Sequence, residues 1–323
     1  MEIHQSLGRI TQCEDQLVCA ARKLARLYEF PRLVNLTERF GEVDIEALRA
    51  LAVSKQNFQL HPNMKGPLSY IGGKNRIATK IIEIFPKHKT YVELFAGGAQ
   101  VLFHKDPSPV EVLNDLDGEV VTFFRVCQSH HEELVRYMKF MVVSREWFDL
   151  LQTQDPKFLT DIQRAARFFF LQKNAYGGLV RHRAFGYSVE EPSRFNPERL
   201  PELIENTHQR LVRVQVENLP YQDILQRYDR PGTLFYLDPP YFGRKLYRFN
   251  FSESDFKELA GRLRKVRGKF VLSLNDVPEV RTIFAGFKLR GIDLPYTVQA
   301  APGKLFHELL ITNFTPQHGG GAR

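Results

Sequence analysis

Thr233-Leu-Phe-Tyr-Leu-Asp-Pro-Pro-Tyr-Phe242 is the most informative stretch of the chain. Its apolar run, Thr233 to Leu237, follows the turn signal Arg230-Pro231-Gly232. Such a run, bounded by residues that break helices and strands, predicts a buried strand. Asp238 then stands at the carboxyl end of that strand, where open α/β sheets bind their ligands.

The residues after this strand suit a planar ring that carries an exocyclic amino group. Pro239 and Pro240 have no N–H and cannot join a sheet ladder, so the carbonyls around them stay available as acceptors. Asp238 adds a carboxylate, and Tyr241 adds a flat aromatic face. The alternative is that Asp-Pro-Pro-Tyr is only a turn, because proline and aspartate are common in turns. Other parts of the chain decide between these interpretations.

Composition and charge limit the class of protein. The 323 residues are 43% hydrophobic and 25% charged, which is typical of a globular protein with one large core or two smaller ones. No apolar run reaches the roughly 18 residues that span a bilayer, and the N-terminus does not resemble a signal peptide. The three cysteines form no close pair, which favours a reducing cytoplasm. The net charge of +8 suits a polyanionic partner such as nucleic acid.

Residues 1–63 are expected to form a helical extension and a linker. Asp15 to Tyr28 and Asp44 to Ala52 have apolar residues at helical spacing, and Ser54 to Gly66 is polar. The two helices could be a helix-turn-helix, but a helical extension that packs on a larger domain is more common. Met64 precedes the first motif, so we expect the catalytic part to start there and to fold without residues 1–63.

Two glycine-containing turns come next. Pro67-Leu-Ser-Tyr-Ile-Gly-Gly-Lys74 leads into the helical spacing of Asn75 to Phe85, a favourable place for an anionic group. In Tyr91-Val-Glu-Leu-Phe-Ala-Gly-Gly-Ala-Gln-Val101, a strand runs through a glycine turn into a helix, as in nucleotide-binding α/β units. The first turn alone is a weak signal, and the second is stronger.

A second predicted strand, Val110 to Asp117, ends in acidic residues. In nucleotide-binding units an acid at this place accepts hydrogen bonds from ribose hydroxyls. Asp115 is the first candidate and Asp117 the second. The alternative is that Asn114-Asp115 caps the helix that starts near Gly118.

The middle of the chain is expected to be mostly helical, over Gly118 to Leu151, Asp161 to Leu171 and Pro197 to Val212. No acid lies between Arg164 and Arg183, and aromatic residues are interleaved there, as is typical of nucleic-acid contact. We expect Phe168 to Phe170 to be core. Arg181 and Arg183 are better contact candidates, as are Arg244 and Lys245 in a second basic stretch beside the proposed pocket.

Three motifs in order carry a resemblance to a known family: Ser69-Tyr-Ile-Gly-Gly-Lys74, Val92-Glu-Leu-Phe-Ala-Gly-Gly98 and Leu237-Asp-Pro-Pro-Tyr241. The chain resembles the Dam-like class of DNA adenine-N6 methyltransferases from about Pro67 to Phe314. Asn174 to Arg181 also resembles part of that family's DNA-recognition domain. One position departs from the family pattern, because Ala99 stands where the family often has the last glycine of Phe-x-Gly-x-Gly.

With this resemblance, the predicted fold is α/β. It has a Rossmann-like methyltransferase sheet with helices on both faces and an inserted, mostly helical target-recognition domain. The S-adenosylmethionine-binding catalytic domain is expected to comprise residues 64–125 and 231–316, and the DNA target-recognition domain residues 126–230. Residues 317–323 are expected to be a disordered tail.

The resemblance implies S-adenosylmethionine as methyl donor and DNA as acceptor, and we expect that DNA to be double-stranded. The predicted reaction needs no metal. The implied catalytic residues are Asp238, Pro239, Pro240 and Tyr241. The implied cofactor-binding residues are Tyr70, Gly73, Lys74, Glu93, Phe95, Gly97, Asp115 and Asp238. The predicted DNA-binding residues are Lys173, Asn174, Arg181, Arg183, Arg244 and Lys245.

The predicted reaction is methyl transfer to N6 of an adenine flipped out of duplex DNA. Hydrogen bonds to Asp238 and to a backbone carbonyl would localise the amine lone pair, and no covalent intermediate is needed. Stacking on Tyr241, worth about 1–3 kcal/mol, would offset much of the cost of flipping. Methylation of cytosine N4 or of RNA adenine, and a catalytically silent DNA-binding regulator, are the alternatives. We expect a restriction-modification enzyme, a monomer or weak dimer, in the cytoplasm at the nucleoid.

Overall fold

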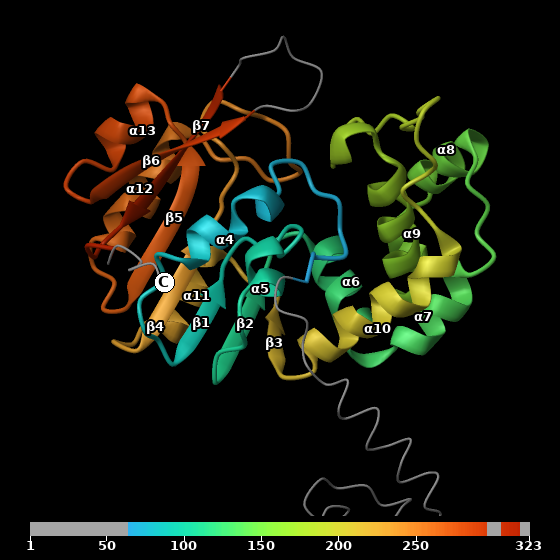
Figure 1. The fold of residues 1–323 in the computed structure, drawn as a ribbon, viewed down its shortest axis with the longest axis horizontal. Coiled ribbons are helices and arrows are strands. Elements are labelled where there is room, and N and C mark those ends of the chain that lie inside the picture. Colours follow the sequence, from blue (N-terminus) through green and yellow to red (C-terminus); the bar gives the residue numbers. More distant parts are fainter. Residues whose placement is uncertain (1–63, 296–304, 317–323) are drawn as a thin grey trace, which may run out of the picture. The chain divides into compact units, whose positions relative to one another are not determined.

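The computed structural model describes residues 64–295 and 305–316. Within them, seven strands form one sheet in the order β3-β2-β1-β4-β5-β7-β6 (Figure 1). The strands are β1 (Thr90–Glu93), β2 (Val110–Asn114), β3 (Val214–Glu217), β4 (Thr233–Leu237), β5 (Lys269–Asn275), β6 (Lys288–Pro295) and β7 (Leu305–Thr312). The strands from β3 to β5 in this order pair in parallel, and β7 lies antiparallel between β5 and β6.

The strand order places a ligand site at the carboxyl ends of β1 and β4. In open α/β sheets, ligands bind where the strand order reverses, and here the chain turns back between these two neighbouring strands. All five residues of β4 are buried, as the apolar run predicted. Glu93 pairs with Tyr236 in the register of β1 and β4, so Asp238 follows directly beyond the end of β1.

Helices cover both faces of the sheet, which confirms the predicted α/β class. One face carries α4 (Ala78–Ile82), α5 (Gln100–His104) and α6 (Gly118–Ser129), and the other carries α11 (Tyr221–Tyr228), α12 (Glu253–Leu263) and α13 (Pro278–Ile283). Alternate residues of one strand therefore enter different cores: Tyr91 packs with the first set of helices and Val92 with the second.

Local sequence explains where several of these elements begin and end. Ser252 caps α12, because its side chain accepts from the backbone N–H of Asp255 while the Asp255 carboxylate accepts from the Ser252 backbone. The predicted helix from Asn75 to Phe85 is shorter in the structure. A 3-10 turn, η1 (Lys74–Arg76), precedes α4, which has only five residues.

Four further helices pack beside α6: α7 (His131–Met138), α8 (Arg145–Thr153), α9 (Asp161–Asn174) and α10 (Leu200–Leu211). Three short 3-10 turns connect them: η2 (Pro156–Phe158), η3 (Tyr176–Gly178) and η4 (Pro197–Arg199). The predicted helical stretch Gly118 to Leu151 is thus broken into α6, α7 and α8. Phe168, Phe169 and Phe170 are buried in the core that continues from the sheet, as predicted.

Hydrogen bonds also join the helical part to the sheet. Arg210 of α10 donates to the carboxylate of Glu111 on β2 and to the carbonyl of Leu102. The predicted boundary at residue 230 also differs from the structure, because β3 and α11 lie before it and belong to the sheet and its cover. The other domain limits stay predictions.

Several predictions fall outside the described residues. They concern the helices within residues 1–63, the helix-turn-helix alternative and the tail 317–323. No helix among residues 64–295 and 305–316 is long and apolar enough to cross a membrane.

Candidate active site

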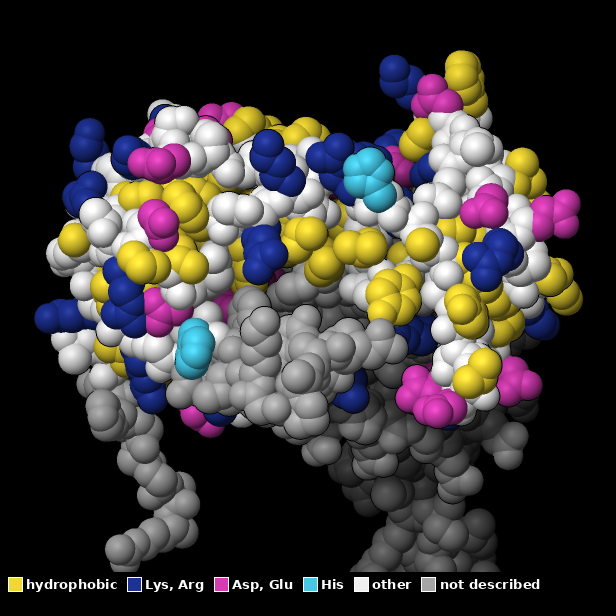
Figure 2. All heavy atoms as spheres, turned by 90° about the horizontal axis from the view of Figure 1, so that it is seen from above, with side chains coloured by type: hydrophobic (Ala, Val, Ile, Leu, Met, Phe, Trp, Pro, Cys, Tyr) yellow, Lys and Arg dark blue, Asp and Glu magenta, His cyan; other side chains and the backbone are white. Residues whose placement is uncertain are grey.

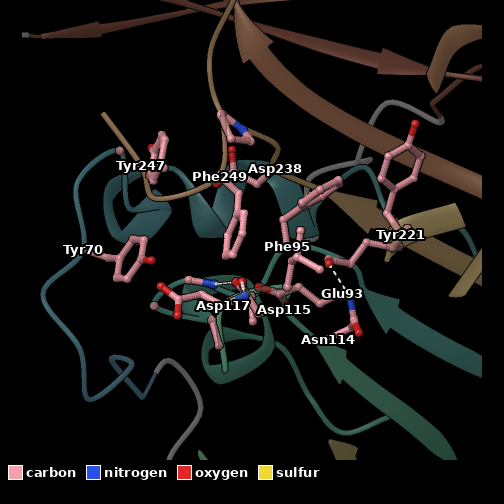
Figure 3. A pocket seen from close by; sticks show the side chains of 18 of the residues that line it. Tyr70, Glu93, Phe95, Asn114, Asp115, Asp117, Tyr221, Asp238, Tyr247 and Phe249 are labelled. Atoms are coloured by element: carbon pink, nitrogen blue, oxygen red, sulfur yellow. Dashed lines mark hydrogen bonds between the residues drawn. The ribbon is translucent and has the colours of Figure 1, made fainter. Parts of the chain in front are cut away.

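A cavity of about 570 Å³ lies at the carboxyl ends of β1, β2 and β4 (Figure 3). Its volume is within the range of small-molecule binding sites. All eight residues predicted to bind the cofactor line it: Tyr70, Gly73, Lys74, Glu93, Phe95, Gly97, Asp115 and Asp238. The structure therefore brings together residues that the sequence places in four separate segments.

The glycine turn after β1 is held by Asp115. One carboxylate oxygen of Asp115 accepts from the N–H of Gly97 at 2.8 Å, and the other accepts from the N–H of Asp117 at 2.8 Å. Gly97 has a positive φ of 47°, and a methyl group there would lie 3.1 Å from the ring of Tyr70. Glycine is therefore favoured at this position by both conformation and space.

Ala99, the departure from the family pattern, is also left-handed, with φ 50° and ψ 32°. A residue with a Cβ in this conformation is strained by about 1–2 kcal/mol. The turn nevertheless closes, and Ala99 is the N-cap of α5. The turn thus keeps its shape without the third glycine.

Asp117 supplies a carboxylate that the neighbouring protein groups do not fully satisfy. Its Oδ1 accepts from the N–H of Glu119 and from Arg248, so Asp117 caps α6. The alternative that Asn114 or Asp115 forms the cap is therefore wrong. The Oδ2 atom of Asp117 is buried and has no hydrogen-bond partner among the described residues. Burial also raises the pKa of the neighbouring Asp115 to about 6.

Lys74 and Asp238 form the ionic centre of the site. The Lys74 ammonium donates to Asp238 Oδ1 at 2.6 Å, to the Gly72 carbonyl at 3.0 Å and to the Tyr241 hydroxyl at 3.1 Å. Burial lowers the pKa of Lys74, but the carboxylates of Asp238 and Glu308 together hold that pKa well above its usual value. Burial raises the pKa of Asp238 to about 6, although Lys74 acts in the opposite direction.

Asp238 and Pro240 of the predicted catalytic set line the pocket, whereas Pro239 and Tyr241 do not. The Tyr241 ring is only 9% exposed, and its hydroxyl donates to Glu308 at 2.6 Å. The sequence predicted that the face of this ring is available for stacking on a base. In the structure the residue is largely buried, and its hydroxyl bonds to a residue of β7. The role of Tyr241 in stacking stays a prediction.

Other aromatic side chains form much of the pocket wall. Tyr70 and Tyr247 lie together on one side, with their rings 6.3 Å apart and inclined by 19° (Figure 3). Phe95 lies 5.7 Å from the rings of Tyr221 and Phe251. The Tyr221 hydroxyl is buried without a hydrogen-bond partner in the described part of the chain. These side chains give the cavity apolar faces beside its acids.

Glu93 is a buried acid at the end of β1. Its carboxylate accepts from the Tyr91 hydroxyl at 2.7 Å and from the Leu102 N–H at 3.0 Å. Burial raises the pKa of Glu93 to about 8. Glu93 is therefore mostly protonated at neutral pH and adds little charge to the pocket.

The predicted DNA contacts fall into two groups. Asn174 is 4% exposed and bonded to the Phe170 carbonyl and to Ser193. Arg183 donates to the Leu179 carbonyl and to Gln172. These positions favour a structural role for Asn174 and Arg183, in place of the predicted DNA contact. Burial lowers the pKa of Lys173 to about 8, which makes it a weaker candidate as well.

Arg181, Arg244 and Lys245 are exposed, as a DNA contact requires. Figure 2 shows Lys and Arg side chains interspersed with hydrophobic ones over one face of the molecule. Among residues 64–295 and 305–316, no group of three or more His, Cys, Asp and Glu side chains is arranged to hold a metal ion.

Sequence reasoning missed Glu308, Tyr221, Tyr247 and Phe249. Glu308 had a signal, since it is an acid in the apolar strand His307-Glu-Leu-Leu-Ile-Thr312. An acid in such a strand is rarely buried unless it is paired. The aromatic residues had no comparable signal, because their contribution depends on how separate loops meet at the pocket.

Comparison with known proteins gives a consistent result. Residues 70–297 match the family of D12 class N6 adenine-specific DNA methyltransferases. The chain is 21% identical over 257 residues to the type II methyltransferase M.CviBI of Paramecium bursaria Chlorella virus NC1A, covering 77% of this chain and 98% of the relative. It is 25% identical over 284 residues to the type II methyltransferase M.MjaIII of Methanocaldococcus jannaschii, covering 76% and 98%.

Among solved structures, an rRNA methylase from Streptococcus thermophilus overlaps with a TM-score of 0.29 at 11% identity, covering 72% of this chain and 93% of that one. An overlap this weak adds nothing to the strand order described above.

Proposed function

This chain belongs to the D12 class of N6 adenine-specific DNA methyltransferases, and from that premise we propose that its pocket holds S-adenosylmethionine beside a flipped-out adenine. The family and the type II relatives establish the reaction as site-specific methylation of adenine in DNA. The proposal concerns which residues bind the two substrates and what each residue does.

The cavity fits the methyl donor in size and in chemistry. Asp115 and Asp117 both line the cavity beside the glycine turn, so their carboxylates are suited to a polar ligand. Asp115 also keeps acceptor capacity for ribose hydroxyls, because a carboxylate can accept about four hydrogen bonds. Phe95 and Tyr221 offer faces for an aromatic ring. Once bound, S-adenosylmethionine supplies an electrophilic methyl group on a sulfonium.

Asp238 is proposed to hold the adenine amine. Its Oδ1 binds Lys74, and no hydrogen-bond partner is found for its Oδ2 within residues 64–295 and 305–316. That oxygen can accept from N6–H and so concentrate the amine lone pair on nitrogen. A carboxyl group whose pKa is about 6 is mostly ionised at pH 7, and it can also take up the proton that N6 loses on methylation.

Two tyrosines are candidates for the face that covers the adenine. Tyr241 is the predicted partner, and stacking would require the face of its ring to become accessible, because the residue is only 9% exposed here. Tyr247 is the second candidate, because its ring lines the pocket. Either ring would supply base stacking of about 1–3 kcal/mol.

Arg181, Arg244 and Lys245 are proposed to contact DNA phosphates. Their exposure and the net charge of +8 favour binding to duplex DNA. The helices α7 to α10 and the loop that follows α9 would then form the target-recognition part. A location at the nucleoid and a monomeric or weakly dimeric state belong to the same proposal.

The open carboxylate oxygen of Asp238 at the end of β4 carries this proposal. The test is methyl transfer from labelled S-adenosylmethionine to unmethylated DNA, followed by nucleoside analysis. We expect N6-methyladenine from the wild type and no product from Asp238→Ala, which should still bind DNA. Wild-type turnover in that variant would exclude the assigned role. Formation of N4-methylcytosine, or modification of RNA only, would contradict the substrate.

A further inference from the structure

We propose that Glu308 is a positioning residue for the methyl transfer, one that holds the Lys74 ammonium and the Tyr241 hydroxyl so that Asp238 faces the adenine. This inference rests on the role proposed above for Asp238. Glu308 lies on β7, near the end of the chain, and it is 70 residues beyond Asp238. It belongs to none of the three motifs by which the family is recognised.

The geometry around Glu308 is a closed network of buried groups. Glu308 is 1% exposed, and its Oε2 accepts from the Tyr241 hydroxyl at 2.6 Å. Its Oε1 accepts from the Ser273 hydroxyl and lies 3.4 Å from the Lys74 ammonium. Ser273 is fully buried and Lys74 is 4% exposed. A carboxylate this deep is stable only when it is paired and hydrogen-bonded, and Glu308 has three such partners.

Glu308 does not itself line the pocket. It acts through two groups that connect the pocket segments: Lys74 from η1, and Tyr241 from the segment after β4. The same Lys74 ammonium binds Asp238 Oδ1, so one cation is shared between two carboxylates. This sharing fixes Asp238 through one oxygen and leaves the other toward the cavity.

The charge of Glu308 should also change the pKa of Asp238. The charged and titratable groups that face Asp238 are Lys74, Glu93, Tyr236, Tyr241, Tyr247 and Glu308. Glu308 raises the pKa of Asp238, and Lys74 lowers it. Asp238 must be ionised to take up the proton that N6 loses, so activity is lost as the pH falls through its pKa. Removing the charge of Glu308 should therefore move this acid limb to lower pH.

The test is Glu308→Gln, which keeps the size of the side chain and removes its charge. We expect kcat to fall about tenfold or more, because hydrogen bonds to a charged group are lost. KM for S-adenosylmethionine should stay within about threefold, since Glu308 is outside the pocket wall. The acid limb of the kcat profile should move to lower pH, which a purely structural role would not produce.

Glu111→Gln is the matched control. Glu111 is also a buried glutamate of the sheet, 4% exposed, and it also has two cationic partners, Lys105 and Arg210. These lie outside the pocket. Glu111→Gln should lower stability without moving the acid limb.

A folded Glu308→Gln protein with wild-type kcat and an unchanged acid limb would overturn the inference. If that variant does not fold, Tyr241→Phe tests the same link, because it keeps the ring and removes the hydroxyl that Glu308 accepts from. We expect kcat to fall several-fold, and wild-type kcat would again overturn the inference. Asp238→Ala separates the two proposals: if it is inactive while Glu308→Gln is normal, only the role of Glu308 fails.

Discussion

Replacing Lys74 by methionine perturbs the ionic centre of the pocket most directly. The Lys74 ammonium lies 2.6 Å from Asp238 and 3.4 Å from Glu308, and the side chain is 4% exposed. Methionine keeps an apolar stem that is one atom shorter, but it leaves the buried carboxylate of Glu308 and the partly buried carboxylate of Asp238 without their cation. Breaking a buried ion pair from one side costs about 3–5 kcal/mol, and we expect Lys74→Met to lose this much stability at pH 8.

The stability lost by Lys74→Met should be smaller at lower pH. Lys74 lowers the pKa of Asp238, so its removal raises that pKa above the present value of about 6. A carboxyl group whose pKa is higher in the folded state than in the unfolded state binds its proton more readily when folded. Its destabilising effect is therefore absent below the unfolded-state pKa, grows as the pH rises from that value to the folded-state pKa, and is complete above it. Lys74→Met should be closer to wild type at pH 5 than at pH 8.

Urea unfolding at both pH values, followed by the fluorescence of the single tryptophan, measures this difference. Lys80→Met is the matched control, because Lys80 is an exposed lysine on the neighbouring helix α4. It should stay within about 0.5 kcal/mol of wild type at both pH values. A Lys74→Met loss below about 1 kcal/mol, or one that is equal at pH 5 and pH 8, would refute the shared-cation arrangement.

Two other perturbations test the turn and the DNA surface. Ala96→Gly should cost about 1–2 kcal/mol in unfolding free energy, from a buried methyl group and a more flexible unfolded chain. Ala99→Gly has the same costs but relieves the strain of a left-handed backbone, so its free energy of unfolding should stay within about 1 kcal/mol of wild type. Equal losses of unfolding free energy in the two variants would contradict this strain. Arg181→Ala should weaken DNA binding and reduce the slope of log K against log salt concentration by about 1. The control in this titration is Arg213→Ala, an exposed arginine that directly precedes β3. An unchanged slope would remove Arg181 from the DNA contacts.

The sequence predicted which residues of the motifs gather at one pocket, for a physical reason. Each motif follows a strand or opens a helix, and the strand order brings their ends to one edge of the sheet. The bounds of β4 agree with the apolar run Thr233 to Leu237, because Pro239 and Pro240 end any ladder. Residues in these motifs therefore meet whatever the length of the segment between them.

Predictions that depended on distant partners were less accurate. The direction of the Tyr241 side chain is set by Glu308, which lies 67 residues later on β7. Asn174 and Arg183 lie in an acid-free stretch that predicted a basic surface. In the structure, α9 is packed so closely that Asn174 is buried, and Arg183 turns back to bind a carbonyl. Charge along a sequence does not reveal which side chains turn inward.

The described contacts also connect the helices between β2 and β3 to the pocket made by the sheet. Gln172 of α9 donates to the carbonyls of Ser69 and Gly178, each at 2.7 Å, and the N–H of Ile71 donates to the Gly178 carbonyl. The loop that leads to Arg181 is thereby hydrogen-bonded to the loop that carries Tyr70 and Lys74. A DNA phosphate bound at Arg181 would therefore have a fixed position relative to Tyr70 and Lys74. The role proposed for Asp238 needs such a connection, because a base would be presented to Asp238 correctly only if the DNA backbone that carries it is held by the same rigid unit.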